Sequence, residues 1–259
     1  MDAGIFPIKH SDAYRWRDGH LQSIDPVQRV QLDHLLGIDR QKAELIRNTE
    51  QFVNGRTANH ALLTGARGTG KSSLVKAALT RFARQGLRLI EVPAHELFAL
   101  PEIVAPLRER DERFILYVDD FSVAADDPSL SALKGALDGG VEEPPENMLI
   151  YATSNRRHLM PEPRRDNEEY QWQGEELHPG ESVEEKISLS ERFGLWLSFP
   201  PFNQEQYLAA VRLHLEELGI EDWNEETQKV ALRWALHRAS RSGRVARQFA
   251  RDYAGRLPA

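Results

Sequence analysis

The residues whose types and spacing most clearly suggest a chemical function lie between Gly65 and Ser73, in the stretch GARGTGKSS. Their spacing fits the pattern G-x-x-x-x-G-K-[ST], in which a glycine-rich loop exposes backbone N–H groups that surround phosphate oxygens. A helix that begins near Lys71 would direct its positive end toward the same phosphates. In such a loop Lys71 reaches the β- and γ-phosphates and the Ser72 hydroxyl binds Mg²⁺. A glycine-rich turn without a ligand is the alternative interpretation.

Two carboxylates follow farther along the chain. Asp119 and Asp120 come directly after the apolar run 114–118, which is typical of a strand buried on both faces. Because α/β folds bind ligands at the carboxyl ends of their strands, the pair is expected at the same site as the loop. We predict that Asp119 holds Mg²⁺ through water and that Asp120 orients or deprotonates an attacking water. Capping of a helix or turn is the other role for such a pair.

Three further polar residues stand at positions that suit phosphate chemistry. Asn155 follows the apolar run 148–153 and is placed to contact a γ-phosphate and the attacking water. Arg192 precedes a fifth apolar run, and Arg244 opens the last predicted helix. Taken singly, the asparagine fits an ordinary turn and each arginine fits a surface charge. Their order along the chain is what favours the functional interpretation.

These residues need a frame, and the apolar pattern predicts one. Short apolar runs alternate with helical patterns, which indicates an α/β fold with a five-stranded parallel sheet and helices on both faces. After residue 200 the apolar residues recur only at helical spacing, which predicts three helices and no strand. The expected strands cover residues 61–64, 87–92, 114–118, 148–153 and 195–199.

The expected division is an N-terminal arm (1–36), an α/β nucleotide-binding domain (37–200) and a small C-terminal all-helical lid domain (201–259). Within the second part, residues 161–186 are the most polar stretch. They fit a solvated loop. A loop that docks a partner through Tyr170 and Trp172 is the sharper alternative.

Composition narrows the function classes. The chain has 259 residues, a net charge of −7 and no cysteine, which excludes disulfides, thiolate zinc sites and thiol chemistry. Its longest apolar runs are too short to span a bilayer, and its N-terminus shows no signal-peptide pattern. We therefore expect a cytoplasmic protein without a membrane partner. The acidic balance argues against broad nucleic-acid binding.

Together these motifs resemble those of the AAA+ ATPases. GARGTGKS corresponds to Walker A, FILYVDD to Walker B, YATSN to sensor 1, SERF to the arginine-finger region and SGR to sensor 2 on a C-terminal helical lid. More narrowly, the chain resembles the bacterial family labelled domain of unknown function 815. The stretches LLGIDRQKAEL, GLRLIEV, EEKISLSERFGLWLSF and SGRVARQF, among others, carry this resemblance from Leu35 to Phe249.

The resemblance implies ATP and Mg²⁺ as cofactors, hydrolysis, and a homo-oligomer in which Arg192 acts on the neighbouring subunit. It also implies an adenine pocket beside Gly37 and Ile38, and a protein client that the motifs do not identify. The implied catalytic residues are Lys71, Asp120, Asn155, Arg192 and Arg244, and the implied metal-binding residues are Ser72 and Asp119. The implied nucleotide contacts are Gly37, Ile38, Gly65, Ala66, Arg67, Gly68, Thr69, Gly70, Lys71, Ser72 and Ser73.

Alternatives stay open at this point. Asp120 stands where the family usually has a glutamate, so hydrolysis is expected to be slow. The chain would then be either an ATPase that remodels a client or a nucleotide-controlled switch of the loader type. A small-molecule kinase shares the G-x-x-G-x-G-K loop, but kinases usually carry their arginine lid inside the sheet domain, whereas here the helices follow the last strand.

Overall fold

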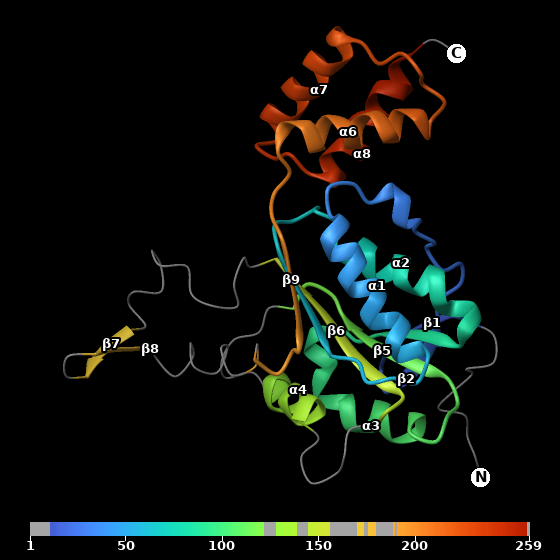
Figure 1. The fold of residues 1–259 in the computed structure, drawn as a ribbon, viewed down its shortest axis with the longest axis vertical. Coiled ribbons are helices and arrows are strands. Elements are labelled where there is room, and N and C mark those ends of the chain that lie inside the picture. The colour runs from blue at the N-terminus through green and yellow to red at the C-terminus, as the bar shows by residue number, and fades with distance from the viewer. Residues whose placement is uncertain are drawn as a thin grey trace.

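The computed structural model describes residues 11–121, 128–138, 145–155, 170–173, 176–179, 189 and 191–257. A twisted sheet lies between two layers of helices, and a small group of three helices sits beyond one end of it (Figure 1). The sheet has seven strands in the order β2-β1-β4-β5-β6-β3-β9. These are β1 (Ala13–Arg17), β2 (His20–Ser23), β3 (Ala61–Gly65), β4 (Leu87–Glu91), β5 (Arg113–Val118), β6 (Met148–Ser154) and β9 (Leu195–Phe199).

The five strands expected from the sequence form the centre and one edge of this sheet. β4, β5, β6, β3 and β9 are mutually parallel, so the α/β class is confirmed. Their register aligns Thr64 with Ser154 and Gly65 with Phe199. The carboxyl ends of β3, β5 and β6 therefore meet at one edge, where the glycine loop, Asp119 and Asn155 follow them.

The strand count differs from the prediction because residues expected in an arm supply two strands. β1 pairs in parallel with β4 and antiparallel with β2. Tyr14 and Trp16 of β1 are buried while Arg15 and Arg17 are exposed, which is the alternation of a half-buried strand. The two strands are joined by Asp18-Gly19, whose φ values of 52° and 75° match the positive values of a tight hairpin turn.

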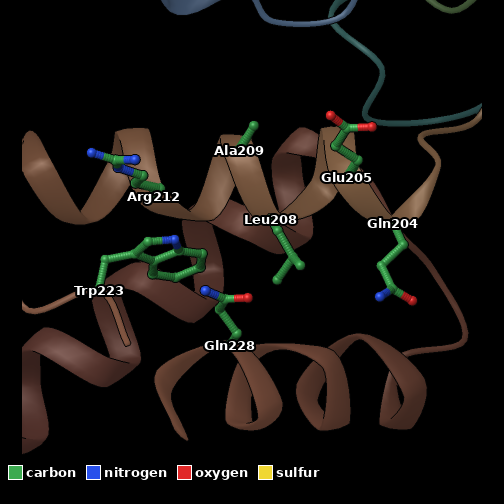
Figure 2. A pocket seen from close by; sticks show the side chains of 7 residues that line it. All are labelled: Gln204, Glu205, Leu208, Ala209, Arg212, Trp223 and Gln228. Carbon is green, nitrogen blue, oxygen red and sulfur yellow. The ribbon is translucent and has the colours of Figure 1, made fainter. Parts of the chain in front are cut away.

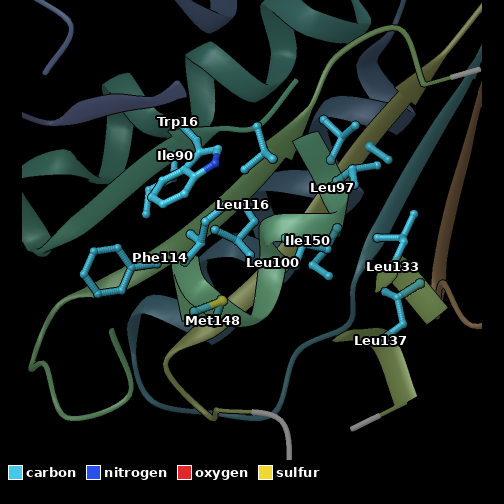
Figure 3. Packing of buried hydrophobic residues seen from close by; sticks show 14 of the residues in the cluster. Trp16, Ile90, Leu97, Leu100, Phe114, Leu116, Leu133, Leu137, Met148 and Ile150 are labelled. Carbon is cyan, nitrogen blue, oxygen red and sulfur yellow. The ribbon is translucent and has the colours of Figure 1, made fainter. Parts of the chain in front are cut away.

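Helices cover both faces of the sheet. α1 (Asp39–Val53) and α2 (Lys71–Phe82) pack on one face. The other face is covered by the 3-10 segment η3 (Ala94–Ala99), α3 (Leu100–Val104) and α4 (Pro128–Asp138). Figure 3 shows this second cluster, in which side chains from β1, β4, β5 and β6 meet those of the helices. The shorter 3-10 segments are η1 (Leu32–His34), η2 (Ala83–Gln85) and η4 (Ala105–Leu107).

The three helices expected after residue 200 form a lid with its own core. They are α6 (Gln204–Glu216), α7 (Glu225–His237) and α8 (Gly243–Arg256). Each begins at a side-chain cap, supplied in turn by Asn203, Asn224 and Ser242. Tyr207 and Phe249 are buried at its centre, and the Tyr207 hydroxyl donates to a backbone carbonyl of α7.

The polar stretch 161–186 is not a plain loop where the structure describes it. β7 (Tyr170–Gln173) and β8 (Glu176–Pro179) pair antiparallel, with two residues between them. The rest of the stretch lies outside the described residues. Throughout the described part of the chain, no helix has the length and apolar character needed to cross a membrane.

Candidate functional site

The loop after β3 has the bare backbone that its glycines predict. Gly65, Gly68 and Gly70 have positive φ values of 131°, 75° and 102°. A Cβ atom on Gly65 would lie 2.1 Å from the carbonyl oxygen of Phe199, so no side chain fits between the loop and β9. α2 begins at Lys71 without a side-chain cap, which leaves its first N–H groups for a ligand.

Lys71 lies over this loop and is buried. Its Nζ donates to the carbonyl oxygens of Gly65 and Ala66, both at 2.8 Å, and to Oδ1 of Asn155 at 3.1 Å. Burial lowers the pKa of Lys71 to about 8, against the opposing effect of Asp120 and Asp119. The amine is thus surrounded by oxygen atoms, which are the kind of partner that a phosphate would supply.

Asp119 is held by two hydroxyl groups. Its Oδ1 accepts from Ser72 Oγ at 2.8 Å and from Thr153 Oγ1 at 2.6 Å. Burial acts to raise the pKa of Asp119, but hydrogen bonds, chiefly from Thr153, lower it on balance. The carboxylate is therefore favoured in its ionised form beside Ser72.

These donors fit Mg²⁺. Ser72 and Asp119 offer only hard oxygen atoms, and Mg²⁺ is typically held by one or two carboxylates together with substrate phosphates and water. Among the described residues, no group of three or more His, Cys, Asp or Glu side chains could hold a metal on its own.

Asp120 and Asn155 are joined beside the loop. Asn155 Nδ2 donates to Asp120 Oδ1, while Asn155 Oδ1 accepts from Lys71, so one amide contacts both charged groups. The backbone N–H of Asp120 donates to Thr153 Oγ1 at 3.0 Å. Asp120 has a φ of 53°, a left-handed conformation that is uncommon for residues with a side chain and is found at functional sites.

The loop opens into a cavity of about 870 Å³. Ile38 and Leu35 lie close to Gly70, since a Cβ there would be 3.4 and 4.0 Å from their side chains. Both side chains give this part of the cavity an apolar wall, a common character of ligand pockets. The predicted residues among the lining side chains are Ile38, Arg67, Gly68, Thr69, Gly70, Lys71, Ser72, Ser73, Asp119, Asp120, Asn155 and Arg244, whereas Gly37, Gly65 and Ala66 lie beside the cavity without lining it.

The lid contacts the phosphate loop directly. The backbone N–H of Gly243 donates to the carbonyl oxygen of Gly68 at 2.9 Å. This places the first turn of α8, with Arg244, at the cavity. Cations outnumber acids in the lining, which suits an anionic ligand. The charged lining side chains are Arg29, Arg67, Lys71, Arg244, Arg247 and Arg251, with Asp119, Asp120 and Glu217.

Arg192 is the predicted site residue that the chain does not bring to the others. It is not among the residues that line the cavity. Instead its Nε donates to Asp138 Oδ2, at the end of α4, at 2.6 Å. Arg192 therefore does not contact the cavity of its own chain.

The structure also shows cavity residues that sequence reasoning missed. Thr153 joins Asp119 to the backbone of Asp120, and its place at the end of a strand beside the loop was a usable signal. Arg247 and Arg251 follow Arg244 on the same face of α8, at spacings of three and seven residues. His34 and Glu217 had no local signal, because they meet only through the fold.

A second, smaller hollow lies within the lid, between α6 and α7. Its volume is about 460 Å³, and its lining includes Leu208, Trp223 and Gln228 (Figure 2). It contains no phosphate-loop residue and no cluster of charges that could assist chemistry. The larger cavity is therefore the candidate active site.

The fold around this cavity is that of the AAA+ P-loop ATPases. Similar solved structures include the Thermotoga maritima RuvB Holliday junction branch migration motor, with a TM-score of 0.53 and 15% identity over 87% of this chain and 64% of that chain. The FIGL-1 AAA domain in complex with ADP has a TM-score of 0.58 and 17% identity, over 88% of this chain and 74% of that chain. The replication initiator DnaA, bound to AMPPCP and single-stranded DNA, has a TM-score of 0.59 and 16% identity, over 88% of this chain and 65% of that chain. The chain thus spans less than two thirds of the RuvB length, and at these identities the likeness establishes the fold alone.

The sequence matches the family model described as "Protein of unknown function (DUF815)" over residues 9–257. The chain therefore belongs to this family. No curated protein matches it in sequence.

Proposed function

We propose that this chain binds ATP with Mg²⁺ and hydrolyses it, as one subunit of a homo-oligomer that remodels a protein client. The observation that carries the proposal is one cavity in which Asn155 contacts both Lys71 and Asp120, with the Ser72–Asp119 pair beside them and Arg244 of the lid in the same lining. These are the groups that phosphoryl transfer to water requires.

The binding roles follow from position. The loop N–H groups and Lys71 would hold the phosphates, and Lys71 would exchange its carbonyl partners for phosphate oxygens. Ser72 and Asp119 would hold Mg²⁺, which neutralises charge on the phosphates when bound. Ile38 and Leu35 would contact the base.

The hydrolytic roles belong to Asp120 and Asn155. Asp120 would accept a proton from the attacking water, and the amide of Asn155 fixes the carboxylate relative to Lys71. Arg244 would place a cation near the terminal phosphate. Because Arg192 lies outside its own cavity, we propose that it serves the cavity of a neighbouring subunit.

A nucleotide-controlled switch is the second candidate, and Asp120 favours it. Its carboxylate is one methylene shorter than that of glutamate and is already engaged by Asn155, so its reach to water is limited. A switch should turn over on the scale of about 10⁻⁴ to 10⁻³ per second unless a partner is added. Turnover measured with and without duplex and single-stranded DNA would also test whether nucleic acid is such a partner.

Calorimetry with Mg-ATP tests the proposal. We expect the wild type to bind ATP and Lys71→Ala to weaken binding or abolish turnover, whereas Lys229→Ala, an exposed lysine on α7, should change neither. Asp120→Asn should keep ATP bound while turnover falls about a hundredfold or more. A folded wild type that does not bind ATP would refute the proposal.

A further inference from the structure

Tyr117 carries a hydroxyl that is buried and has no partner. Its side chain is 2% exposed on β5, two residues before Asp119. Among the described residues, four side chains have a buried polar atom without a hydrogen-bond partner, and two of these, Arg88 and Asn147, bond through their other atoms. Tyr117 and Trp234 have a single polar atom each, and Trp234 belongs to the lid. An unsatisfied buried group costs free energy, so the Tyr117 hydroxyl requires an explanation.

The fold places this hydroxyl behind the metal-binding pair. Tyr117 packs in the cluster that β5 forms with α2, whereas Leu116 and Val118 pack on the opposite face of the sheet. Asp119 lies on the same side as Tyr117, since it bonds to Ser72 in the first turn of α2. Burial first, and then the charge of Asp119, raises the pKa of Tyr117, so the two groups interact. Tyr117 does not line the cavity, and it therefore approaches Asp119 from the core side.

Asp119 has acceptor capacity left for this donor. Its Oδ1 accepts from Ser72 Oγ and from Thr153 Oγ1, whereas no described residue donates to its Oδ2. An ionised carboxylate has about four acceptor positions, and a phenol carries a hydrogen that it can donate at neutral pH. In the chain without ligand, an unused donor and an unused acceptor therefore lie near each other without forming a hydrogen bond.

We propose that Tyr117 is a positioning residue of the Mg²⁺ site, and that its hydroxyl donates to Oδ2 of Asp119 once Mg²⁺ is bound. A cation shared by Ser72 and Asp119 must change how the carboxylate is held, because Oδ1 is otherwise occupied by two hydroxyls. A hydrogen bond that forms only in that state adds to the affinity for the metal and not to the stability of the ligand-free chain. The inference rests on the proposed function and deepens it, because it identifies a residue that controls metal affinity without touching the metal or the nucleotide.

The test is a calorimetric titration of Mg²⁺ into the full chain with bound ADP, a nucleotide that the proposed reaction does not consume. Tyr117→Phe removes the hydroxyl and keeps the ring that fills the core. The variant should bind Mg²⁺ about tenfold more weakly than the wild type, the lower end of the loss expected when a partner of a metal ligand is removed. Its affinity for ADP in EDTA should be unchanged. Its melting temperature in EDTA should not fall, because the hydroxyl has no partner there.

Tyr151→Phe is the matched control. Tyr151 stands opposite Tyr117 in the register of β5 and β6 and is also buried, but its hydroxyl is hydrogen-bonded to Thr49 at 2.9 Å and to Asn48 at 3.1 Å. This variant should lower the melting temperature and leave the affinity for Mg²⁺ unchanged. A fluorotyrosine label provides a second measurement that keeps the hydroxyl. At position 117 its fluorine NMR resonance should shift when Mg²⁺ is added to the ADP complex, and at position 151 it should not.

Two results would overturn the role of Tyr117. One is an equal affinity for Mg²⁺ in the wild type and in Tyr117→Phe, together with a fluorine resonance at position 117 that does not respond to Mg²⁺. The other is a purely structural effect, in which Tyr117→Phe lowers the melting temperature in EDTA and weakens the binding of ADP and of Mg²⁺ by the same factor. A wild type that binds no nucleotide would instead refute the proposed function on which the inference rests. The two failures are therefore distinguishable.

Discussion

Arg244 and Arg192 follow the same kind of argument in the sequence but have opposite surroundings in the structure. Arg244 lines the cavity beside the phosphate loop, and no described residue forms an ion pair with it. Arg192 stands before β9, away from the cavity, and pairs with Asp138. Arg244 thus lines a cavity without an ion-pair partner among the described residues, whereas Arg192 is engaged by a carboxylate of its own chain.

The difference shows which site residues the structure of one subunit can place and which need a neighbouring subunit. A residue that acts on its own subunit's ligand must lie at that cavity, and Arg244 does. A residue that acts on a neighbour needs only a place at the surface and a local partner that orients it. Asp138 is such a local partner for Arg192. Substitutions at both arginines can test whether Arg244 acts within its own subunit and Arg192 acts on a neighbour.

The largest effect should come from Arg192→Ala. In GTPases an arginine finger contributes about 10³ to 10⁵ in rate, so we expect turnover to fall about a thousandfold while ATP binding persists. Mixing these subunits with Lys71→Ala subunits should restore activity, because some interfaces then pair an intact loop with an intact Arg192. Arg233→Ala, an exposed arginine on α7, serves as the control. No rescue on mixing, with turnover independent of protein concentration, would show that Arg192 does not act between subunits.

Arg244→Ala should have a smaller effect, confined to its own subunit. Loss of one charge-assisted contact to phosphate should weaken ATP binding or turnover by about ten- to a hundredfold. The melting temperature without nucleotide should stay unchanged, because Arg244 is exposed. Mixing with Lys71→Ala subunits should not rescue this variant. Rescue would mean that Arg244 serves a neighbour and that the comparison is wrong.

A change of pH should alter the affinity for ATP through the ionisation of Lys71. The pKa of Lys71 is about 8 in the chain without ligand, and a bound phosphate favours the charged amine and raises this pKa. ATP affinity should therefore be level below about pH 7 and fall about tenfold between pH 7 and 9. Calorimetry at pH 8 in buffers with different ionisation heats should detect proton uptake. Lys71→Arg should remove the pH dependence, and a wild-type affinity that stays constant to pH 9 would contradict the assignment.

The smallest effect should come from Asp138→Asn. An ion pair that is partly exposed is worth about 0–1 kcal/mol, so removing this partner of Arg192 should raise turnover by no more than about fivefold. The rise should appear only at protein concentrations where oligomers form, as measured by turnover across a dilution series. A fall in turnover would show instead that Asp138 orients Arg192 productively.

Much of the frame was accessible from the sequence because its signals are local. The loop, the five strand runs and the three helices after residue 200 depend on residues within one or two turns of each other, and all of these elements are present. Strands β1 and β2 were missed although Asp18-Gly19 is a typical hairpin turn. The alternation of Tyr14 and Trp16 covers only five residues, too short to stand out without its long-range partner β4.

The site was accessible only in part, for a similar reason. Motifs place Lys71, Asp119 and Asn155 near one sheet edge, but they do not say that Thr153 joins Asp119 to Asp120. Nor does any local pattern relate His34 to Glu217, since that contact depends on how the lid sits on the sheet domain. Contacts between distant segments require the fold.

The placement of β9 has a consequence for how subunits would communicate. Its first residues follow Arg192, and its last residue, Phe199, accepts a hydrogen bond from Ala66 of the phosphate loop at 3.2 Å. A strand of five residues, about 16 Å long, thus connects the residue proposed to sense the neighbour's nucleotide with the loop that holds the subunit's own. We expect a displacement of Arg192 to move β9 and with it the phosphate loop. Hydrolysis in one subunit would then alter the nucleotide site of the neighbouring subunit. Trp196→Phe removes the 2.9 Å bond from the indole of β9 to Thr64 and should reduce the Hill coefficient of turnover while leaving ATP affinity unchanged; an unaltered coefficient would exclude this route.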